Sequence, residues 1–308
     1  MRVAVTGASG FIGKELLSIL SKIEDTSVIA LTRGENCVTE NGSHVIWVAT
    51  DYSVESLTDI FRGVCEGDIV DACHVDAVIH LAGVRGTEND PEKFRINETI
   101  TSNILSAMKD AGVNRIVFAS TISVYDDEDL IPWTEDSPLK GRTQYGESKI
   151  RCEELIRSHA ADYGYTYGIA RIAQVIGSGE KRRGMINVFM DAAAYGGQLK
   201  VIGRSVAKRQ YIYVKDLANL LLILTVGNSV YSADSNLIVN AGMPKAYTNL
   251  EIARIVNKVY GNKTPINYDD SHQETIRPSC MNVGYLEETV GMAPCDVDKA
   301  LEDIRRNR

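Results

Sequence analysis

Short apolar runs alternate with amphipathic segments through the first half of the chain. The apolar runs predict strands at Val3–Val5, Val28–Leu31, His44–Val48, Ala77–Leu81, Arg115–Ala119 and Gly168–Arg171. The segments between them predict helices at Gly13–Lys22, near Val54–Arg62, and at Pro91–Ala111 and Tyr145–Tyr163. Buried strands separated by helices are typical of a parallel sheet covered on both faces, with right-handed crossovers. The pattern therefore predicts an α/β fold.

The alternation weakens after about Gly177. We expect helices at Met185–Tyr195, Asn249–Tyr260 and Asp296–Arg306, and short strands at Leu199–Ile202 and Leu237–Asn240. Tyr211–Val214 leads into a further predicted helix at Asp216–Leu224. The polar stretch Gly261–Val283 has the least regular pattern, and we expect it to be a loop over a ligand.

Three glycines follow the first predicted strand, in the order Gly7-x-x-Gly10-x-x-Gly13. Gly7 permits a tight turn, Gly10 lets the backbone approach a phosphate, and Gly13 lets the next helix pack close to the strand. A pyrophosphate would then lie at the helix N-terminus, where free N–H groups and the helix dipole favour anions. Glycine triples alone are weak evidence, but this one lies between a strand and a helix, as a dinucleotide site requires.

The second predicted strand ends in Ala30-Leu31-Thr32-Arg33. An acidic residue at this position would bind the ribose 2′-hydroxyl and indicate NAD. Arg33 could instead face a 2′-phosphate, so the hypothesis is a preference for NADP(H), with NAD as the other possibility. The alternative is an exposed arginine that binds no ligand.

Tyr145 and Lys149 lie four residues apart at the start of a predicted helix, on one face of it. A free tyrosine has a pKa near 10, too high for a base at neutral pH. A nearby ammonium and an oxidised nicotinamide would both favour the phenolate and lower this pKa. Spacing alone favours an ordinary pair on the helix surface. The glycine turn and the strand end at Ser120–Tyr125 favour a proton-transfer site.

Composition excludes several classes of protein. The chain has 308 residues and a formal charge of -8, which argues against nucleic acid as its main partner. Neither a signal peptide nor an apolar run of the roughly 20 residues needed to span a bilayer is present. The six cysteines have no CxxC spacing, as expected for isolated thiols in a reducing cytoplasm, and the five histidines show no metal-ligand spacing.

Further motifs extend over nearly the whole chain. They are Thr6–Gly13, Asp51, His80-Leu81-Ala82-Gly83, Asn97, Ser120-Thr121-x-x-Val124-Tyr125, Tyr145-x-x-x-Lys149, Arg171-x-x-Gln174, Lys208–Asp216 and Arg277-Pro278. In this order they resemble the extended short-chain dehydrogenase/reductase family, in its nucleotide-sugar epimerase/dehydratase/reductase branch. The resemblance implies a Rossmann-type doubly wound parallel sheet with a smaller C-terminal substrate-binding domain. The expected domains are residues 1–171 plus about 207–240, and about 172–206 plus 241–308.

The resemblance also implies roles for the matched positions. Thr121, Tyr145 and Lys149 would be catalytic, with the Thr121 hydroxyl donating to the sugar oxygen. The implied cofactor residues, together with Arg33, are Gly7, Ser9, Gly10, Phe11, Ile12, Gly13, Asp51, Tyr52, Leu81, Ala82, Gly83, Asn97, Ser120, Tyr145, Lys149 and Ile172. The implied substrate residues are Arg85, Thr121, Gln174, Arg209 and Arg277. Arg209 and Arg277 would hold the diphosphate of a nucleotide sugar, because arginine offers forked donors to phosphate oxygens.

Departures from the family pattern narrow the reaction. Dehydratases of this family carry an Asp-Glu pair directly after the catalytic Thr, where this chain has Ile122 and Ser123, so dehydration is not expected. The acidic residues 126–129 are expected to form a solvated loop. Gln174 replaces the usual Asn, and Cys280 replaces the usual Asp of the late arginine motif, which weakens the assignment of Arg277.

Two catalytic hypotheses remain, and both use the same residues. In the favoured one, NADPH reduces the 4-keto group of a nucleotide-linked 6-deoxyhexose, with Tyr145 as proton donor. In the alternative, a tightly bound NAD oxidises C4 of a nucleotide sugar and the hydride returns to the other face, which is 4-epimerisation. A third possibility is a non-catalytic NADP(H)-binding protein. The resemblance also implies a homodimer, through the helices Pro91–Ala111 and Tyr145–Tyr163.

Overall fold

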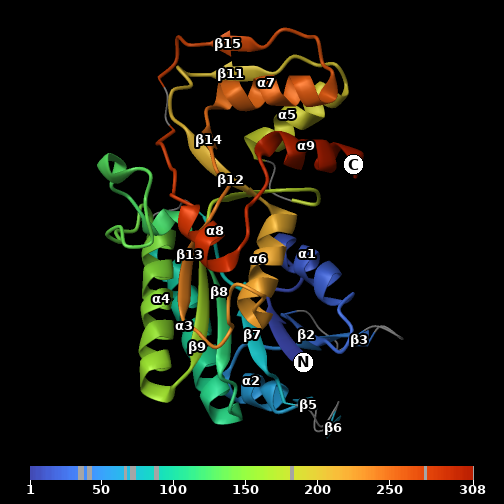
Figure 1. Cartoon of the computed structure of the whole chain (residues 1–308), viewed down its shortest axis with the longest axis vertical. Helices are drawn as coiled ribbons and strands as arrows, with labels where there is room; N and C mark the ends of the chain where they lie inside the picture. The colour runs from blue at the N-terminus through green and yellow to red at the C-terminus, as the bar shows by residue number, and fades with distance from the viewer. Residues whose placement is uncertain are drawn as a thin grey trace.

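A computed structural model shows a large sheet with helices on both faces and a smaller unit at one end of it (Figure 1). It describes residues 1–33, 38–39, 44–65, 68–69, 74–86, 90–180, 184–273 and 276–307. Within these ranges the large sheet has the strand order β13-β9-β8-β7-β1-β2-β4-β3. Its strands are β1 (Arg2–Thr6), β2 (Ser27–Thr32), β3 (Val38–Thr39), β4 (Val45–Ala49), β7 (Ala77–His80), β8 (Arg115–Thr121), β9 (Thr166–Ile172) and β13 (Leu237–Ala241). Only the edge pair β3–β4 is antiparallel among these described strands, which confirms the predicted α/β fold.

Each face of the large sheet is covered by its own helices because successive strand residues point to opposite sides. Val3 and Val5 belong to the core under α1 (Phe11–Leu20) and α6 (Val214–Val226). Ala4 belongs to the core under α2 (Val54–Phe61), α3 (Pro91–Ala111) and α4 (Gln144–Tyr163). The chain thus builds a three-layer arrangement of the Rossmann type.

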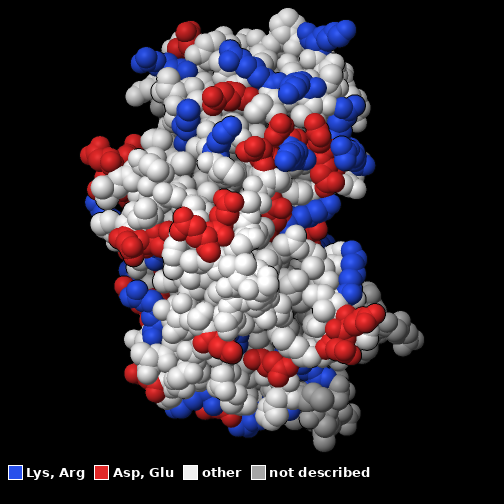
Figure 2. Space-filling view, in the orientation of Figure 1, with Lys and Arg blue, Asp and Glu red and all other residues white. Residues whose placement is uncertain are grey.

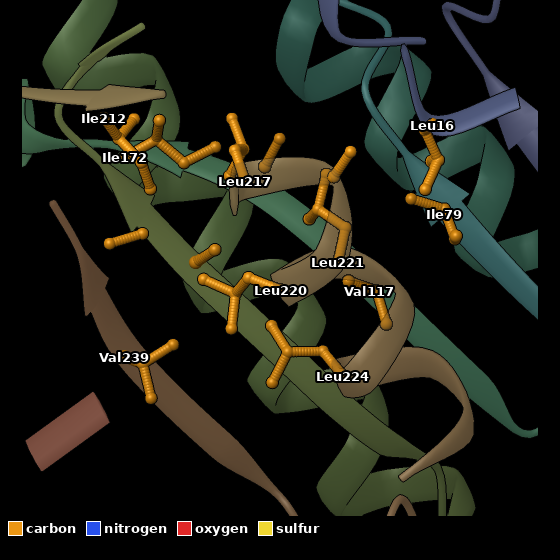
Figure 3. Packing of buried hydrophobic residues seen from close by; sticks show 14 of the residues in the cluster. Leu16, Ile79, Val117, Ile172, Ile212, Leu217, Leu220, Leu221, Leu224 and Val239 are labelled. Atoms are coloured by element: carbon orange, nitrogen blue, oxygen red, sulfur yellow. The ribbon is translucent and has the colours of Figure 1, made fainter. Parts of the chain in front are cut away.

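Helix α6 comes late in the chain and packs on the large sheet, including strand β8 from the first half. Its buried leucines, Leu217, Leu220, Leu221 and Leu224, lie against Val117, Ile172 and Val239 of the sheet (Figure 3). Burying one leucine side chain stabilises a fold by about 1.5–3 kcal/mol relative to exposure. This packing fixes the segment directly before α6, which carries the predicted substrate residue Arg209.

Local signals fix the ends of the two long helices beside the candidate site. Helix α3 begins after Asp90, whose carboxylate accepts from the Lys93 amide, and Pro91 occupies the first turn. Helix α4 begins after Thr143, whose hydroxyl accepts from the Gly146 amide at 3.2 Å. Both helices end at a glycine in the left-handed region, and both bounds lie within one residue of those predicted.

The smaller unit has its own hydrophobic core. Its helices are α5 (Met185–Ala194), α7 (Asn249–Tyr260) and α9 (Val297–Arg306). One sheet has the strand order β10 (Gln174–Ile176), β12 (Arg209–Tyr213), β14 (Ala246–Tyr247). A second sheet pairs β11 (Lys200–Ile202) with β15 (Asn267–Asp269). Helix α8 (Gly284–Val290) and the pair β5 (Val64–Cys65) and β6 (Asp68–Ile69) complete the described elements, with 3-10 turns η1 (Ile122–Val124) and η2 (Glu128–Leu130).

The stretch Gly261–Val283 is not simply a loop, as the sequence pattern predicted. Its residues Asn267–Asp269 form β15, which pairs in parallel with β11 at the far end of the smaller unit (Figure 1). The polar strand was missed because two of its three side chains are exposed and leave no apolar alternation. The domain division remains a proposal: β13 completes the large sheet, while β12 joins β10 and β14.

Candidate active site

The turn between β1 and α1 lets two backbone segments approach each other closely. Gly7 has a φ of 68°, in the left-handed region, and a Cβ on it would lie 2.8 Å from the Ala82 nitrogen. A Cβ on Gly13 would lie 2.5 Å from the Gly7 oxygen. Helix α1 begins after Gly10, which provides no side-chain cap for the amides of the first turn. This geometry fits a dinucleotide pyrophosphate at the helix N-terminus, with Ser9, Phe11 and Ile12 in the same turn.

His80 is buried and links β1 to the end of β7 through hydrogen bonds. It belongs to one of the sequence motifs, but no role was predicted for it. The Thr6 hydroxyl accepts from the Leu81 and Ala82 amides at 3.1 and 3.0 Å and lies 2.8 Å from His80 Nδ1. Burial, with a smaller contribution from Lys149, holds the His80 pKa well below its usual value, so the ring is neutral. Since Thr6 already accepts twice, its proton goes to Nδ1. Nε2–H then donates to Thr101 at 3.1 Å.

Asn97 of α3 shapes the segment after β7 through its side chain. Its amide donates to the Val84 carbonyl and the Ser148 hydroxyl, each at 3.0 Å, and its oxygen accepts from the Val84 amide at 2.7 Å. A Cβ on Gly83 would lie 3.0 Å from this oxygen. The predicted cofactor residues Leu81, Ala82 and Gly83 are thereby fixed beside the glycine turn.

Thr121, Tyr145 and Lys149 lie together at the carboxyl end of the large sheet. The Thr121 hydroxyl, at the end of β8, acts on the Tyr145 phenol and lowers its pKa. Lys149 is buried and its Nζ donates to the Ala119 carbonyl at 2.9 Å. The same Nζ lies 6.0 Å from the centroid of the Tyr145 ring. The structure therefore brings together all three residues predicted to be catalytic.

Burial dominates the ionisation of this cluster. It raises the pKa of Tyr145 to about 12, although the Arg85 cation and the Thr121 hydroxyl oppose this. It lowers the pKa of Lys149, an effect that the neighbouring Cys152 and Glu153 oppose. The protein alone thus keeps the Tyr145 phenol protonated at neutral pH. Additional positive charge, such as that of an oxidised nicotinamide, would be needed to lower this pKa.

The residues predicted beside the adenosine half lie next to the glycine turn. Burial raises the pKa of Tyr52, an effect that the Gly7 backbone and the Arg33 charge oppose. Arg33 itself is exposed at the end of β2. Asp51 is also exposed, and its carboxylate accepts from the Ser53 amide at 2.8 Å. Arg33 and Asp51 are thus open to a ligand on this side of the turn.

Ser120 has a buried partner that the sequence argument did not identify. Its hydroxyl donates to the carboxylate of Glu153, one helical turn after Lys149. Arg171 on β9 pairs with the same carboxylate at 2.8 Å. Ile172, the next residue of β9, pairs in register with Thr121. Ser120 thus faces the interior, whereas Thr121 faces Tyr145.

Arg85 lies across from the smaller unit. Its guanidinium is 3.5 Å from the carboxylate of Glu180, to which the Asn187 amide donates at 3.1 Å. Glu180 and Asn187 line a cavity of about 330 Å³ together with Gly177. Arg85 also acts electrostatically on Tyr145. Glu180 and Asn187 were not identified from the sequence because each stands outside a motif.

The two arginines predicted to hold a diphosphate come from neighbouring backbone segments. The backbone of Arg209 pairs with that of Ser279 in an isolated parallel β-bridge, and Ser279 is two residues after Arg277. The Arg209 guanidinium is half-buried, and one nitrogen donates to the Asn249 side chain at 3.4 Å. Gln174, on the adjacent β10, is exposed. Arg209 and Gln174 thus lie on paired strands of the smaller sheet, and Arg277 lies in the segment that pairs with β12.

The acidic loop after Tyr125 is not simply solvated, as the sequence predicted. Asp126 and Glu128 pair with Arg277 at 2.8 and 2.5 Å. The Arg142 guanidinium carbon lies 5.2 Å from the centroid of the Trp133 ring, and its Nε lies 3.3 Å from an Asp126 carboxylate oxygen. The sequence could not indicate this pairing because about 150 residues separate the partners. A phosphate would have to compete with these carboxylates for Arg277.

Other kinds of site are not apparent in the described part of the chain. No group of three or more His, Cys, Asp or Glu residues there could hold a metal ion. None of the helices described is long and apolar enough to cross a membrane. Acidic and basic side chains are interspersed over the face shown in Figure 2.

The sheet and the glycine turn define a Rossmann-type protein with a candidate dinucleotide site, beside which the Thr-Tyr-Lys cluster forms a candidate catalytic site. The model of the NAD dependent epimerase/dehydratase family matches residues 3–242, and the chain belongs to this family. It is 30% identical over 305 residues to the UDP-glucose 4-epimerase of Bacillus subtilis (strain 168), covering 88% of this chain and 85% of that protein.

Solved structures agree with this assignment. The crystal structure of UDP-N-acetylglucosamine 4-epimerase from Bacillus cereus is similar with a TM-score of 0.84 and 29% identity, covering 100% of this chain and 96% of that one. UDP-glucuronic acid 4-epimerase from Bacillus cereus, in complex with UDP-glucuronic acid and NAD, has a TM-score of 0.80 at 18% identity, covering 99% and 98%. At that identity the likeness concerns the fold alone.

Proposed function

We propose that the chain is a nucleotide-sugar 4-epimerase that uses NAD. One observation carries the proposal: the Thr121, Tyr145 and Lys149 cluster lies at the same carboxyl end of the parallel sheet as a glycine turn fit for a dinucleotide. The similarity to 4-epimerases supports epimerisation over the NADPH-dependent reduction that the sequence pattern favoured. The exposed Arg33 is compatible with either cofactor, and the relatives give no support to an NADP(H) preference.

The cofactor residues fit the group by their shape. The amides of α1 and the turn at Gly7, Gly10 and Gly13 would hold the pyrophosphate, and Leu81 to Gly83 would pass beneath the ring system. NAD, when bound, supplies a hydride acceptor that later returns the hydride. Lys149 is placed to donate to a ribose hydroxyl after leaving the Ala119 carbonyl, to which it donates in this structure.

Proton transfer falls to Tyr145. Its phenolate oxygen would remove the proton of the sugar 4-hydroxyl as C4 is oxidised, while the Thr121 hydroxyl donates to the same sugar oxygen and orients it. The keto sugar would then rotate within the site and present the opposite face of C4. Once C4 is reduced from that face, Tyr145 would return the proton to the 4-oxygen. Arg85, Thr121 and the charge of an oxidised nicotinamide would together oppose the effect of burial on the Tyr145 pKa.

The substrate would lie between the two units. Arg209 and Arg277 would bind the diphosphate, and Arg277 would exchange its carboxylate partners for phosphate oxygens. Arg85 and Gln174 would border the sugar. A homodimer through α3 and α4 also remains a proposal. Its test is sedimentation, where a monomer at micromolar concentration would contradict it.

Tyr145→Phe tests the proposal directly. General acid-base catalysis contributes about 10²–10⁴-fold, so we expect a loss of that size in the 4-epimerisation rate of UDP-hexoses. Bound NAD and the melting temperature should stay close to those of the wild-type chain, because only one oxygen is removed. Full activity of the variant would refute the role of Tyr145.

A further inference from the structure

A buried ion pair lies behind the Thr-Tyr-Lys cluster, and no step of the proposed reaction uses it. Glu153 of α4 and Arg171 of β9 have side chains only 2% and 3% exposed. One guanidinium nitrogen donates at 2.8 Å and another at 3.2 Å to the carboxylate, in a forked arrangement. A buried pair of this kind is weak evidence for stability, because desolvation offsets most of the attraction. Its position therefore calls for another explanation.

The carboxylate of Glu153 is connected to the end of β8. It accepts from the hydroxyl of Ser120, which directly precedes Thr121. On β9, Arg171 and Ile172 pair in register with Ser120 and Thr121. Ser120, Glu153 and Arg171 thus hold the strand end that presents the Thr121 hydroxyl to Tyr145.

The remaining donors of Arg171 extend the network to the loop after β8. One nitrogen donates to the Tyr125 hydroxyl and to the Glu135 carbonyl, both at 2.8 Å. Tyr125 donates onward to Asn240 at 2.8 Å, and the Asn240 amide donates to the Trp133 carbonyl at 3.0 Å. The ion pair is therefore connected on both sides of Thr121, through the strand and through the loop that follows it.

Glu153 also contributes charge next to Lys149. Burial lowers the pKa of Lys149, while Cys152 and Glu153 raise it. The other titratable groups around the ammonium are Tyr145 on its own helix and His80 on β7, whose ring is neutral. Burial raises the pKa of the Cys152 thiol, which keeps it uncharged at neutral pH. With Cys152 uncharged, Glu153 is the carboxylate that favours a protonated Lys149.

We propose that Glu153, anchored by Arg171, is a positioning residue for the reaction: it fixes Ser120 and, through it, the Thr121 hydroxyl. This inference rests on the proposed function, since it assigns Glu153 a role through Thr121 and Lys149. Removing the pair should lower turnover while leaving the binding of cofactor and nucleotide sugar intact.

Two variants separate placement from charge. Ser120→Ala removes the link to Thr121 and leaves the ion pair in place. The double variant E153Q/R171M removes both charges together, so that neither is left buried alone. We expect both to lower kcat at least tenfold, with KM and the dissociation constant of NAD within threefold of wild type. The alkaline limb of the pH profile should move to lower pH in the double variant only, because a less favoured ammonium loses its proton sooner.

Arg115→Met is the matched control. Arg115 is a buried arginine at the opposite end of β8 and donates to the Tyr231 hydroxyl at 2.5 Å. Its loss should lower the melting temperature without changing kcat. Variants of the Glu153 network that keep wild-type kcat and pH profile, with an active wild-type chain, would overturn the inference alone. A wild-type chain that turns over no nucleotide sugar would overturn the proposed function and this inference with it.

Discussion

Gly146 provides the sharpest test of how the fold places Tyr145. It follows Tyr145 in the first turn of α4, where a Cβ would lie 2.0 Å from the Ser123 carbonyl oxygen. Real Cβ contacts essentially never fall below 3.0 Å, so Gly146→Ala must separate α4 from the 122–124 turn by at least 1.0 Å, the difference between the two distances. This displacement moves Tyr145 relative to Thr121.

We expect Gly146→Ala to impair catalysis strongly without unfolding the chain. A misplacement of about 1 Å can reduce catalysis by about 10²-fold. Overpacking of this kind costs typically about 1–3 kcal/mol of folding free energy. We therefore expect Gly146→Ala to remain folded and to lose about two orders of magnitude in kcat, measured by epimerisation of a UDP-hexose, alongside its melting temperature.

Gly164→Ala, at the other end of the same helix, is the matched control. Gly164 has a φ of 72° and no heavy atom within 4 Å of its built Cβ. An alanine there costs about 1–2 kcal/mol through left-handed backbone strain, without a clash. The 20 residues of α4 put this site about 30 Å from Tyr145. Equal kcat values for the two variants, at equal melting temperatures, would refute the reasoning.

Three further predictions concern charge. Arg85→Gln should move the acid limb of kcat/KM to higher pH, because the Arg85 cation lowers the Tyr145 pKa; an unmoved limb would contradict this. Asp126→Asn should lower the KM for nucleotide sugars, since Arg277 would then be freer to bind a diphosphate, whereas a raised KM would show that the acidic loop itself assists binding. Arg33→Ala should raise the KM for NADP(H) more than that for NAD(H), and equal changes would show that Arg33 does not read the 2′ position.

The fold was largely predictable because its signals are local. The strands around β1 are continuous apolar runs, and Asp90, Pro91 and Gly112 mark the ends of α3 within the sequence itself. Strand β15 was not predictable, because its pairing with β11 depends on residues almost 70 positions away and leaves no apolar alternation.

The candidate site was predictable only in part for a related reason. Tyr145 and Lys149 share a helix turn, so their spacing is visible in the sequence. The Glu153–Arg171 pair joins a helix to a strand, and the Arg277–Asp126 pair spans about 150 residues. No periodicity records such contacts. The raised Tyr145 pKa likewise reflects burial, which depends on the assembled units rather than on neighbours in the chain.

A deuterium-transfer experiment tests the central claim most directly. The purified chain, with NAD, would be incubated with UDP-hexoses carrying deuterium at C4, and the products analysed by NMR and mass spectrometry. We predict a mixture of C4 epimers that retains the deuterium at C4, with no net consumption of cofactor. Loss of the label to solvent, or consumption of NADPH on a 4-keto sugar without any epimerisation, would contradict the account.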